Sequence, residues 1–287
     1  MEKLLVGIDA EHASQVAVDW VIARANTRPL EISLFSAFDM IADDPLASDA
    51  LLARTRARIE EAAPTAIVTV ELADRSIFEG LIERSADADL MVIGSHPHRR
   101  VRSILTGALP SGVVARAHCP TIVVPDDWEP GGTHIVLGVA DDHSSDSAIS
   151  FAADEARLSG QPLDAVHAWR LPVPEMDAVS TLVVGPEALD AIHTELLARV
   201  TDRLGAEAGE AVIRGILRHG DGGLELDRSL DDASLLVLGT HGHGPAIGAL
   251  LGSTVQHMLH RGLVPIAVVP NPVQAGRNGR LAARSHA

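Results

Sequence analysis

The chain has 287 residues, 46% of them hydrophobic, which is enough for two ordinary domains with buried cores. Its net charge of −16 disfavours a sequence-independent grip on nucleic acid or on an anionic membrane, and 2% aromatic residues leave little for stacking single-stranded bases. No apolar run is as long as a membrane span and no signal segment opens the chain, so we expect a cytoplasmic protein.

The first 125 residues alternate apolar runs with helix-length segments. Several runs are almost continuously apolar, as in parallel strands that helices cover on both faces. Alternation of this kind predicts a parallel sheet with right-handed crossovers. The expected strands are 3–9, 30–38, 66–72, 89–95 and 121–125, and the expected helices are 14–26, 51–62, 77–88 and 111–118.

Three blocks of the sequence recur in the same order farther along the chain, which indicates a duplication. The second copy is longer by 14 residues, and we expect the additional residues within 171–190. The paired blocks are LLVGIDAEHAS (4–14) with IVLGVADDHSS (135–145), ADADLMVIGSHP (86–97) with DDASLLVLGTHG (231–242), and HCPTIVVP (118–125) with LVPIAVVP (263–270).

The duplication predicts two tandem domains of one α/β fold. Each domain is expected to hold a five-stranded parallel sheet with helices on both faces. The strands that end in VVP would otherwise be bare edges, so we expect the two domains to pack against each other through them. We place the first domain at 1–128, the second at 129–272, and a polar, disordered tail at 273–287.

The stretch GTHGHGPAIGALLGST, residues 239–254, is the most specific part of the sequence. Glycines let backbone lie close to a ligand, and a glycine loop that enters a helix is a common phosphate site, although a flexible connection could have the same composition. A Walker-type phosphate loop is excluded because it needs a lysine, and Lys3 is the only one in the chain. A dinucleotide fingerprint is excluded because Ile247 stands where its third glycine belongs.

The spacing G-x2-G-x9-G-[ST] fits this stretch without a gap, at Gly239, Gly242, Gly252 and Ser253. Together with IVLGV, HAW and VPIAVVP in the expected order, it makes the chain resemble the universal stress protein family in its tandem form, over about residues 3–270. The resemblance implies Rossmann-like domains. It also implies binding of ATP, ADP or AMP with Mg²⁺ at the phosphates, since many members of the family bind adenine nucleotides and many others do not. The residues that the resemblance assigns to the nucleotide are Val139, Ala140, Asp141, Ala168, Gly239, Thr240, Gly242, His243, Gly252, Ser253, Thr254 and Val255.

The chemistry of a helix start supports this assignment in the second copy. Gly252, Ser253 and Thr254 would open the next helix and present unpaired N–H groups to phosphate oxygens. A plainer interpretation is that Ser253 or Thr254 only caps the helix, because Ser253 and Gln256 have the spacing of a capping box. Both interpretations can hold at once.

The two copies depart from the family pattern in opposite ways. In the second copy, Ala140 stands where the family's first strand usually ends in an Asp, with Asp141 beside it. The first copy keeps Asp9 at that position, but Pro97 replaces the second glycine of the loop. Proline has no N–H and its ring fills space that bare backbone would leave open. We therefore expect one nucleotide per chain, held in the second copy.

Other candidate chemistry is weaker. His241 and His243, with His257 and His260, suggest a metal site, but no carboxylate or cysteine joins them at ligand spacing. Neither a serine-hydrolase elbow nor a zinc-protease motif occurs, so we assign no catalytic residue and no metal ligand. The single cysteine, Cys119, excludes an intrachain disulfide and is expected to be a small buried residue at a helix end.

Three functions remain open at this point. The first is a cytoplasmic stress-response regulator that responds to an adenine nucleotide and is not a dedicated catalyst. The second is a slow Mg²⁺-dependent ATPase, for which no positioned general base is visible. The third is a nucleotide-free interaction or chaperone-like protein in which both loops are vestigial. The resemblance further implies that two tandem chains pair as a homodimer, with neither nucleic acid nor membrane as a partner.

Overall fold

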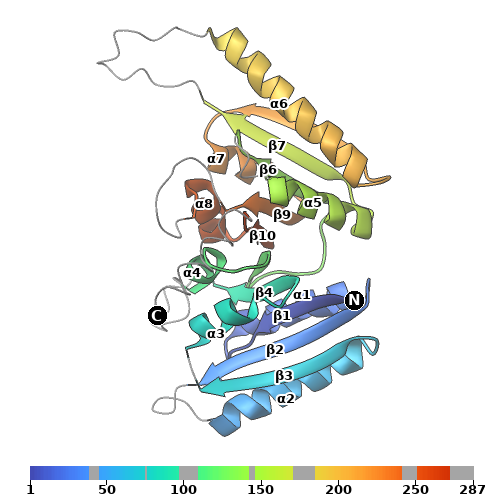
Figure 1. Ribbon diagram of the computed structural model, residues 1–287, viewed down its shortest axis with the longest axis vertical. Helices are drawn as coiled ribbons and strands as arrows, with labels where there is room; N and C mark the ends of the chain where they lie inside the picture. The colour runs from blue at the N-terminus through green and yellow to red at the C-terminus, as the bar shows by residue number, and fades with distance from the viewer. Residues whose placement is uncertain are drawn as a thin grey trace, which may run out of the picture.

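The computed structural model describes residues 1–38, 45–74, 76–96, 109–141, 146–170, 185–240 and 251–271. Strands and helices alternate through both halves of the chain, as predicted (Figure 1). The first half consists of β1 (Glu2–Gly7), α1 (His12–Ala25), β2 (Leu30–Phe38), α2 (Pro45–Ala62), β3 (Ile67–Asp74), α3 (Ile77–Arg84), β4 (Leu90–Ser95), α4 (Leu109–Val114) and β5 (Thr121–Pro125). The second half consists of β6 (His134–Val139), α5 (Asp146–Ser159), β7 (Leu163–Trp169), α6 (Pro186–Glu207), β8 (Ile213–His219), α7 (Gly222–Asp227), β9 (Ala233–Gly239), α8 (Ser253–Arg261) and β10 (Ile266–Val269).

The five predicted strands of the first half are all present, and two of its helices are shorter at their carboxyl ends than predicted. Helix α3 ends at Arg84, where the sequence pattern ran on to 88. Helix α4 ends at Val114, and the chain then turns before Pro120. In the second half, residues 171–184, most of the stretch expected to hold the additional residues, lie outside the described residues.

One ten-stranded sheet joins the two halves, in the order β3-β2-β1-β4-β5-β10-β9-β6-β7-β8. Within each half every strand pairs in parallel with its neighbours. At the centre β5 and β10 pair antiparallel, with Ala267 opposite Ile122. The prediction that the two VVP strands cover each other's edge is confirmed. The two strands pair because an edge strand would otherwise leave its N–H and C=O groups without hydrogen-bond partners.

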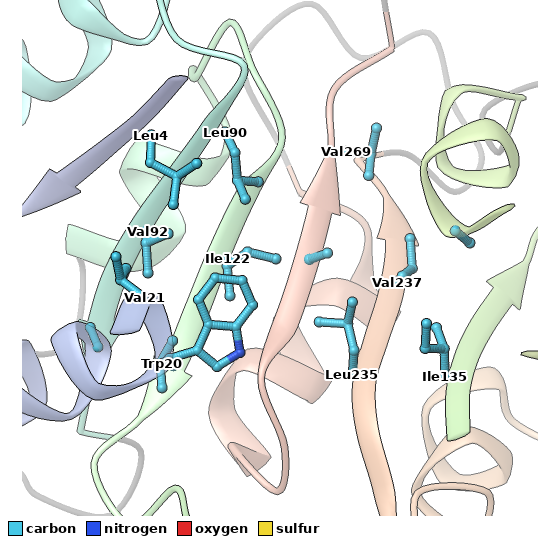
Figure 2. Close-up of a cluster of buried hydrophobic side chains, with 14 of the residues drawn as sticks. Leu4, Trp20, Val21, Leu90, Val92, Ile122, Ile135, Leu235, Val237 and Val269 are labelled. Atoms are coloured by element: carbon cyan, nitrogen blue, oxygen red, sulfur yellow. The ribbon is translucent and has the colours of Figure 1, made fainter. Parts of the chain in front are cut away.

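The helices form a layer on each face of the sheet, and each layer encloses its own hydrophobic core. The first core receives side chains from α1, α2, α5 and α6, and the second from α3, α4, α7 and α8. Both cores run across the β5–β10 junction. Figure 2 shows the first, with Val92 and Ile122 on one side of the junction and Leu235 and Val269 on the other. The halves are therefore packed as one body.

None of the described helices combines the length and the apolar character that a membrane crossing requires.

Candidate functional site

The site predicted for the second half lies at one edge of the sheet, namely the edge that is formed by the carboxyl ends of β6, β7 and β9 and not by an outer strand. Strand β6 pairs in parallel with both β7 and β9, so the carboxyl ends of the three strands share this edge. The edge brings together Val139 at the end of β6, Ala168 near the end of β7 and Gly239 at the end of β9. In open α/β sheets this edge is where ligands bind. The predicted site residues Gly242 and His243 lie outside the described residues.

Helix α8 starts directly against the end of β9. The N–H of Gly252 donates to the carbonyl of Thr240 at 3.3 Å, and the N–H of Thr240 donates to the carbonyl of Val269 at 3.1 Å. Gly252 is the N-cap residue, and it has no side chain with which to cap the helix. Ser253, Thr254 and the buried Val255 thus form its first turn.

The capping-box interpretation of Ser253 is wrong. Ser253 is the first helical residue and not the N-cap, because the first helical hydrogen bond runs from the N–H of Gln256 to the carbonyl of Gly252, at 3.0 Å. The side chain of Gln256 does not return to Ser253. Its Nε2 donates instead to the carbonyl of Leu251, at 2.9 Å. Since glycine has no side-chain oxygen, the first N–H groups of α8 have no side-chain acceptor from their own cap.

The hydroxyl of Thr240 is buried at the foot of α8. The residue is 4% exposed, and its Oγ1 has no hydrogen-bond partner among the described residues. A buried hydroxyl without a partner costs about 1–3 kcal/mol, so such groups call for a partner from a ligand, water or another segment. In the first half the equivalent position is Ser95, whose Oγ donates to the carbonyl of Val124 at the long distance of 3.5 Å.

A pair of histidines that the sequence analysis did not single out lies beside the ends of β6 and β7, with His167 on β7 and His193 on α6. The Nδ1–H of buried His167 donates to the carbonyl of Val139 at 2.8 Å. Its Nε2 lies 2.8 Å from Nδ1 of His193 on α6, and the ring of His193 stacks on Trp169. His167 is part of the HAW segment, but its partner is 26 residues away. No sequence pattern signals this contact.

Beyond β6 the chain continues through Ala140, which is half-buried, to Asp141, which is exposed. Ala168 is half-buried on the neighbouring strand. The carboxylate that usually ends the first strand of such domains is therefore displaced by one residue, onto a position that faces solvent.

The corresponding edge of the first half is acidic. Asp9 follows β1, and its Oδ1 accepts the N–H of Glu11 at 3.0 Å. Burial, and then the neighbouring charge of Glu11, raise the pKa of Asp9, although the hydrogen bond from Glu11 opposes them. His96 Nδ1 lies 2.6 Å from Asp126 Oδ2, and His96 Nε2 lies 3.8 Å from Glu11 Oε2. Two carboxylates thus lie beside one buried imidazole, whose charge also acts on Asp9.

Little space is left at this first edge. The cleft there measures about 40 Å³, and Asp9, Ser14, Gly94 and His96 are among its lining residues. A Cβ on Gly94 would lie 2.3 Å from the backbone of Ala13, so the end of β4 is pressed against the start of α1. The loop with Pro97 lies outside the described residues.

Two of the four histidines considered as metal ligands, His241 and His243, are outside the described residues. Of the others, His257 Nε2 lies 3.4 Å from Asp227 Oδ2, which also accepts from Arg261, while His260 is exposed. Within the described ranges, no three His, Cys, Asp or Glu side chains gather in a way that could hold a metal ion.

Comparison with known proteins agrees with this architecture. The sequence model of the universal stress protein family matches residues 1–125 and 132–270. Universal stress protein Rv2623 of Mycobacterium tuberculosis is 27% identical, with 92% of this chain and 95% of that protein covered. The crystal structure of a universal stress protein from Archaeoglobus fulgidus matches with a TM-score of 0.67 at 17% identity, covering 93% of this chain and 98% of that chain.

A second solved structure, of a universal stress protein in complex with cAMP, is 22% identical and has a TM-score of 0.36; the match covers 44% of this chain and 98% of that chain. The family model divides at the linker between β5 and β6, and the full-length relatives align along both halves. The chain belongs to the universal stress protein family, in its tandem two-domain form.

Proposed function

We propose that this protein binds one adenine nucleotide per chain, at the edge of the second half where α8 begins, and acts as a nucleotide-responsive regulator. One observation carries this proposal. Helix α8 opens at Gly252 without a side-chain cap, and its start is tied by a backbone hydrogen bond to Thr240, whose buried hydroxyl has no partner among the described residues. Helix starts of this kind are ready-made sites for phosphate.

The phosphates would lie at the first turn of α8. The N–H groups of Ser253, Thr254 and Val255 have no intrahelical acceptor, and the helix dipole adds positive potential there. The exposed hydroxyl of Ser253 offers one more donor. Gly239 and Gly242 leave room for a ligand close to the backbone. Bound with the nucleotide, Mg²⁺ would neutralise part of the phosphate charge, which matters here because Lys3, the only lysine, lies on β1 in the first half.

The adenosine would lie along the ends of β6 and β7, beside Val139, Ala140 and Ala168. The exposed carboxylate of Asp141 is the group nearest in sequence that could accept from the ribose hydroxyls. Because it extends from a different backbone position than the usual Asp, we expect the phosphates to contribute more of the affinity than the ribose does. ADP and ATP should accordingly bind much more tightly than adenosine.

The first half is proposed to take no nucleotide. Among the described residues of its edge, Asp9, Glu11 and Asp126 gather negative charge, which opposes phosphate. The close packing of Gly94 on Ala13 leaves no room for a ligand to pass close to the backbone there.

The test is titration calorimetry of the full chain with ATP and Mg²⁺, with ADP, AMP and adenosine in parallel. We expect a stoichiometry of one nucleotide per chain and an affinity that falls from ATP through ADP and AMP to adenosine. Two equal sites per chain would contradict the asymmetry of the halves. No binding at any concentration up to the millimolar range would favour a nucleotide-free interaction protein.

A further inference from the structure

The paired histidines His167 and His193 hold together three elements of the second half. His167 is on β7, bonds to the end of β6 through the carbonyl of Val139, and bonds to α6 through His193. The His193 ring stacks on Trp169 with 4.8 Å between ring centroids and 17° between planes. Trp169 in turn receives the edge of His219 from β8, at 4.9 Å.

The amino-terminal part of α6 makes few buried contacts with the sheet; apart from the histidine pair, the half-buried Leu196 packs against the first core. Residues 186–196 are all exposed or half-buried, and the first buried residue of the helix is Leu197. Figure 1 shows these turns (yellow) at the margin of the molecule, beside β7. Segments with few buried contacts open at a small free-energy cost, so one well-formed contact has a large influence on them. His193 supplies that contact.

The number of protons on the pair decides whether this contact can form. Since the carbonyl of Val139 can only accept, Nδ1 of His167 carries a proton, and in the neutral ring Nε2 is then an acceptor. Nδ1–H of His193 donates to it. A first additional proton can be placed on Nε2 of His193 without breaking the bond. A second one on Nε2 of His167 would place two N–H groups and two positive charges against each other, 2.8 Å apart.

The groups around the pair have opposing effects on the pKa of His193. Burial, followed by the charge of His167, lowers the pKa of His193, while Asp141 beyond β6 and Asp190 on α6 partly oppose this. The pKa of His193 in the folded protein is thus below its ordinary value of 6.5. His219 faces the same cluster from β8, through Trp169.

We propose that His167 and His193 form a proton-sensitive latch that docks the amino-terminal turns of α6 on β7 in neutral solution and releases them in mildly acidic solution. The direction of this pH dependence follows from the number of protons that the docked and released states bind. Because the docked state binds protons more weakly than the released state, docking is complete above pH 6.5 and is lost as the pH falls below it. The proposed latch does not depend on nucleotide binding at the neighbouring edge.

Hydrogen exchange of the backbone amides of the full chain tests the latch, measured by NMR or mass spectrometry at pH 7.5 and pH 5 and corrected for the intrinsic pH dependence. Residues 186–196 should lose protection at pH 5 by severalfold, whereas residues 197–207 should keep theirs. Exchange of 186–196 that does not change with pH would overturn the proposal.

Two variants and a control separate the latch from general acid destabilisation. His193→Asn can face Nε2 of His167 with its amide N–H or, when that nitrogen carries a proton, with its amide oxygen, so its protection should be the same at both pH values. His167→Asn keeps the bond to Val139 but loses the one to His193, and should be weakly protected already at pH 7.5. His260→Asn, at an exposed position on α8, should behave as the unmodified chain does. If His193→Asn lost protection at pH 5 as strongly as the unmodified chain, the latch would be wrong.

Discussion

Arg24 on α1 and Glu155 on α5 form a two-pronged ion pair between the two halves of the chain. Nη1 of Arg24 lies 2.8 Å from Oε2 of Glu155, and Nη2 lies 2.6 Å from Oε1. The two side chains are 5% and 9% exposed. Arg24 also pairs with Glu2 on β1, and Arg28 approaches Glu155 at 3.4 Å. This network, together with the β5–β10 pairing, links helices that follow the first strand of each half.

Replacing Glu155 should destabilise both halves together. Glu155→Ala leaves a buried guanidinium with Glu2 as its remaining partner, and we expect a loss of about 3 kcal/mol in the free energy of unfolding. Urea unfolding followed by circular dichroism measures it. The control is Asp154→Ala, which removes the exposed pair with Arg157 and should cost at most about 0.5 kcal/mol. Equal effects of the two variants would show that the buried pair contributes no more to the free energy of unfolding than the exposed pair does.

The same pair predicts a specific response to acid. Burial by itself would raise the pKa of Glu155, but the hydrogen bonds and charge of Arg24 outweigh it, so the folded-state pKa is below the ordinary value near 4.5. Its contribution to stability is therefore complete above pH 4.5 and is lost as the pH falls through the folded-state value. Glu155→Gln should have a shallower decline of stability between pH 5 and pH 3 than the unmodified chain. An identical slope would contradict this assignment.

Nucleotide binding should depend on Gly242 and be indifferent to Pro97. Gly242→Val adds a branched side chain where bare backbone is expected to lie along the phosphates, so we predict that binding is abolished. Pro97→Gly should leave the stoichiometry at one, because the acidic edge formed by Asp9 and its neighbours remains. Calorimetry with ATP and Mg²⁺ gives both results. A Gly242→Val chain that binds normally would refute the proposed site.

Hydrolysis of bound ATP should be negligible. A phosphoryl transfer needs positioned charge at the γ-phosphate, and no ammonium group is available there because Lys3 is on the far half of the molecule. Phosphate release from ATP and Mg²⁺ should be far slower than about 1 s⁻¹, the low end of ordinary enzyme turnover. Steady-state release near that rate, retained after further purification, would favour the ATPase.

The thiol of Cys119 should be unreactive in the folded protein. Burial raises its pKa to about 12, and the residue is 4% exposed, so thiolate is scarce and inaccessible at neutral pH. A disulfide reagent at pH 8 should modify it only after denaturant is added. Rapid modification of the native chain would mean that the segment after α4 opens readily.

The sequence by itself determined the repeated strand–helix order, the parallel halves and the pairing of the VVP strands. These features depend on short-range patterns, namely almost continuously apolar runs with helical segments between them, and on the general cost of leaving a strand edge unpaired. The glycine spacing likewise located the edge of the sheet at which β9 ends at Gly239 and α8 begins after Gly252. These patterns involve residues that are close together in the chain, so the sequence alone reveals them.

Only the tertiary structure decided where α8 begins and which distant side chains meet. The capping-box interpretation failed because the helical hydrogen bonds of α8 begin at the carbonyl of Gly252, one residue before a serine cap would require. The His167–His193 contact spans 26 residues, and the Arg24–Glu155 contact spans 131. Residues so far apart leave no periodic trace in a single sequence. Their bonds form because the sheet order places β7 under α6 and α1 beside α5, and that order is a property of the folded chain.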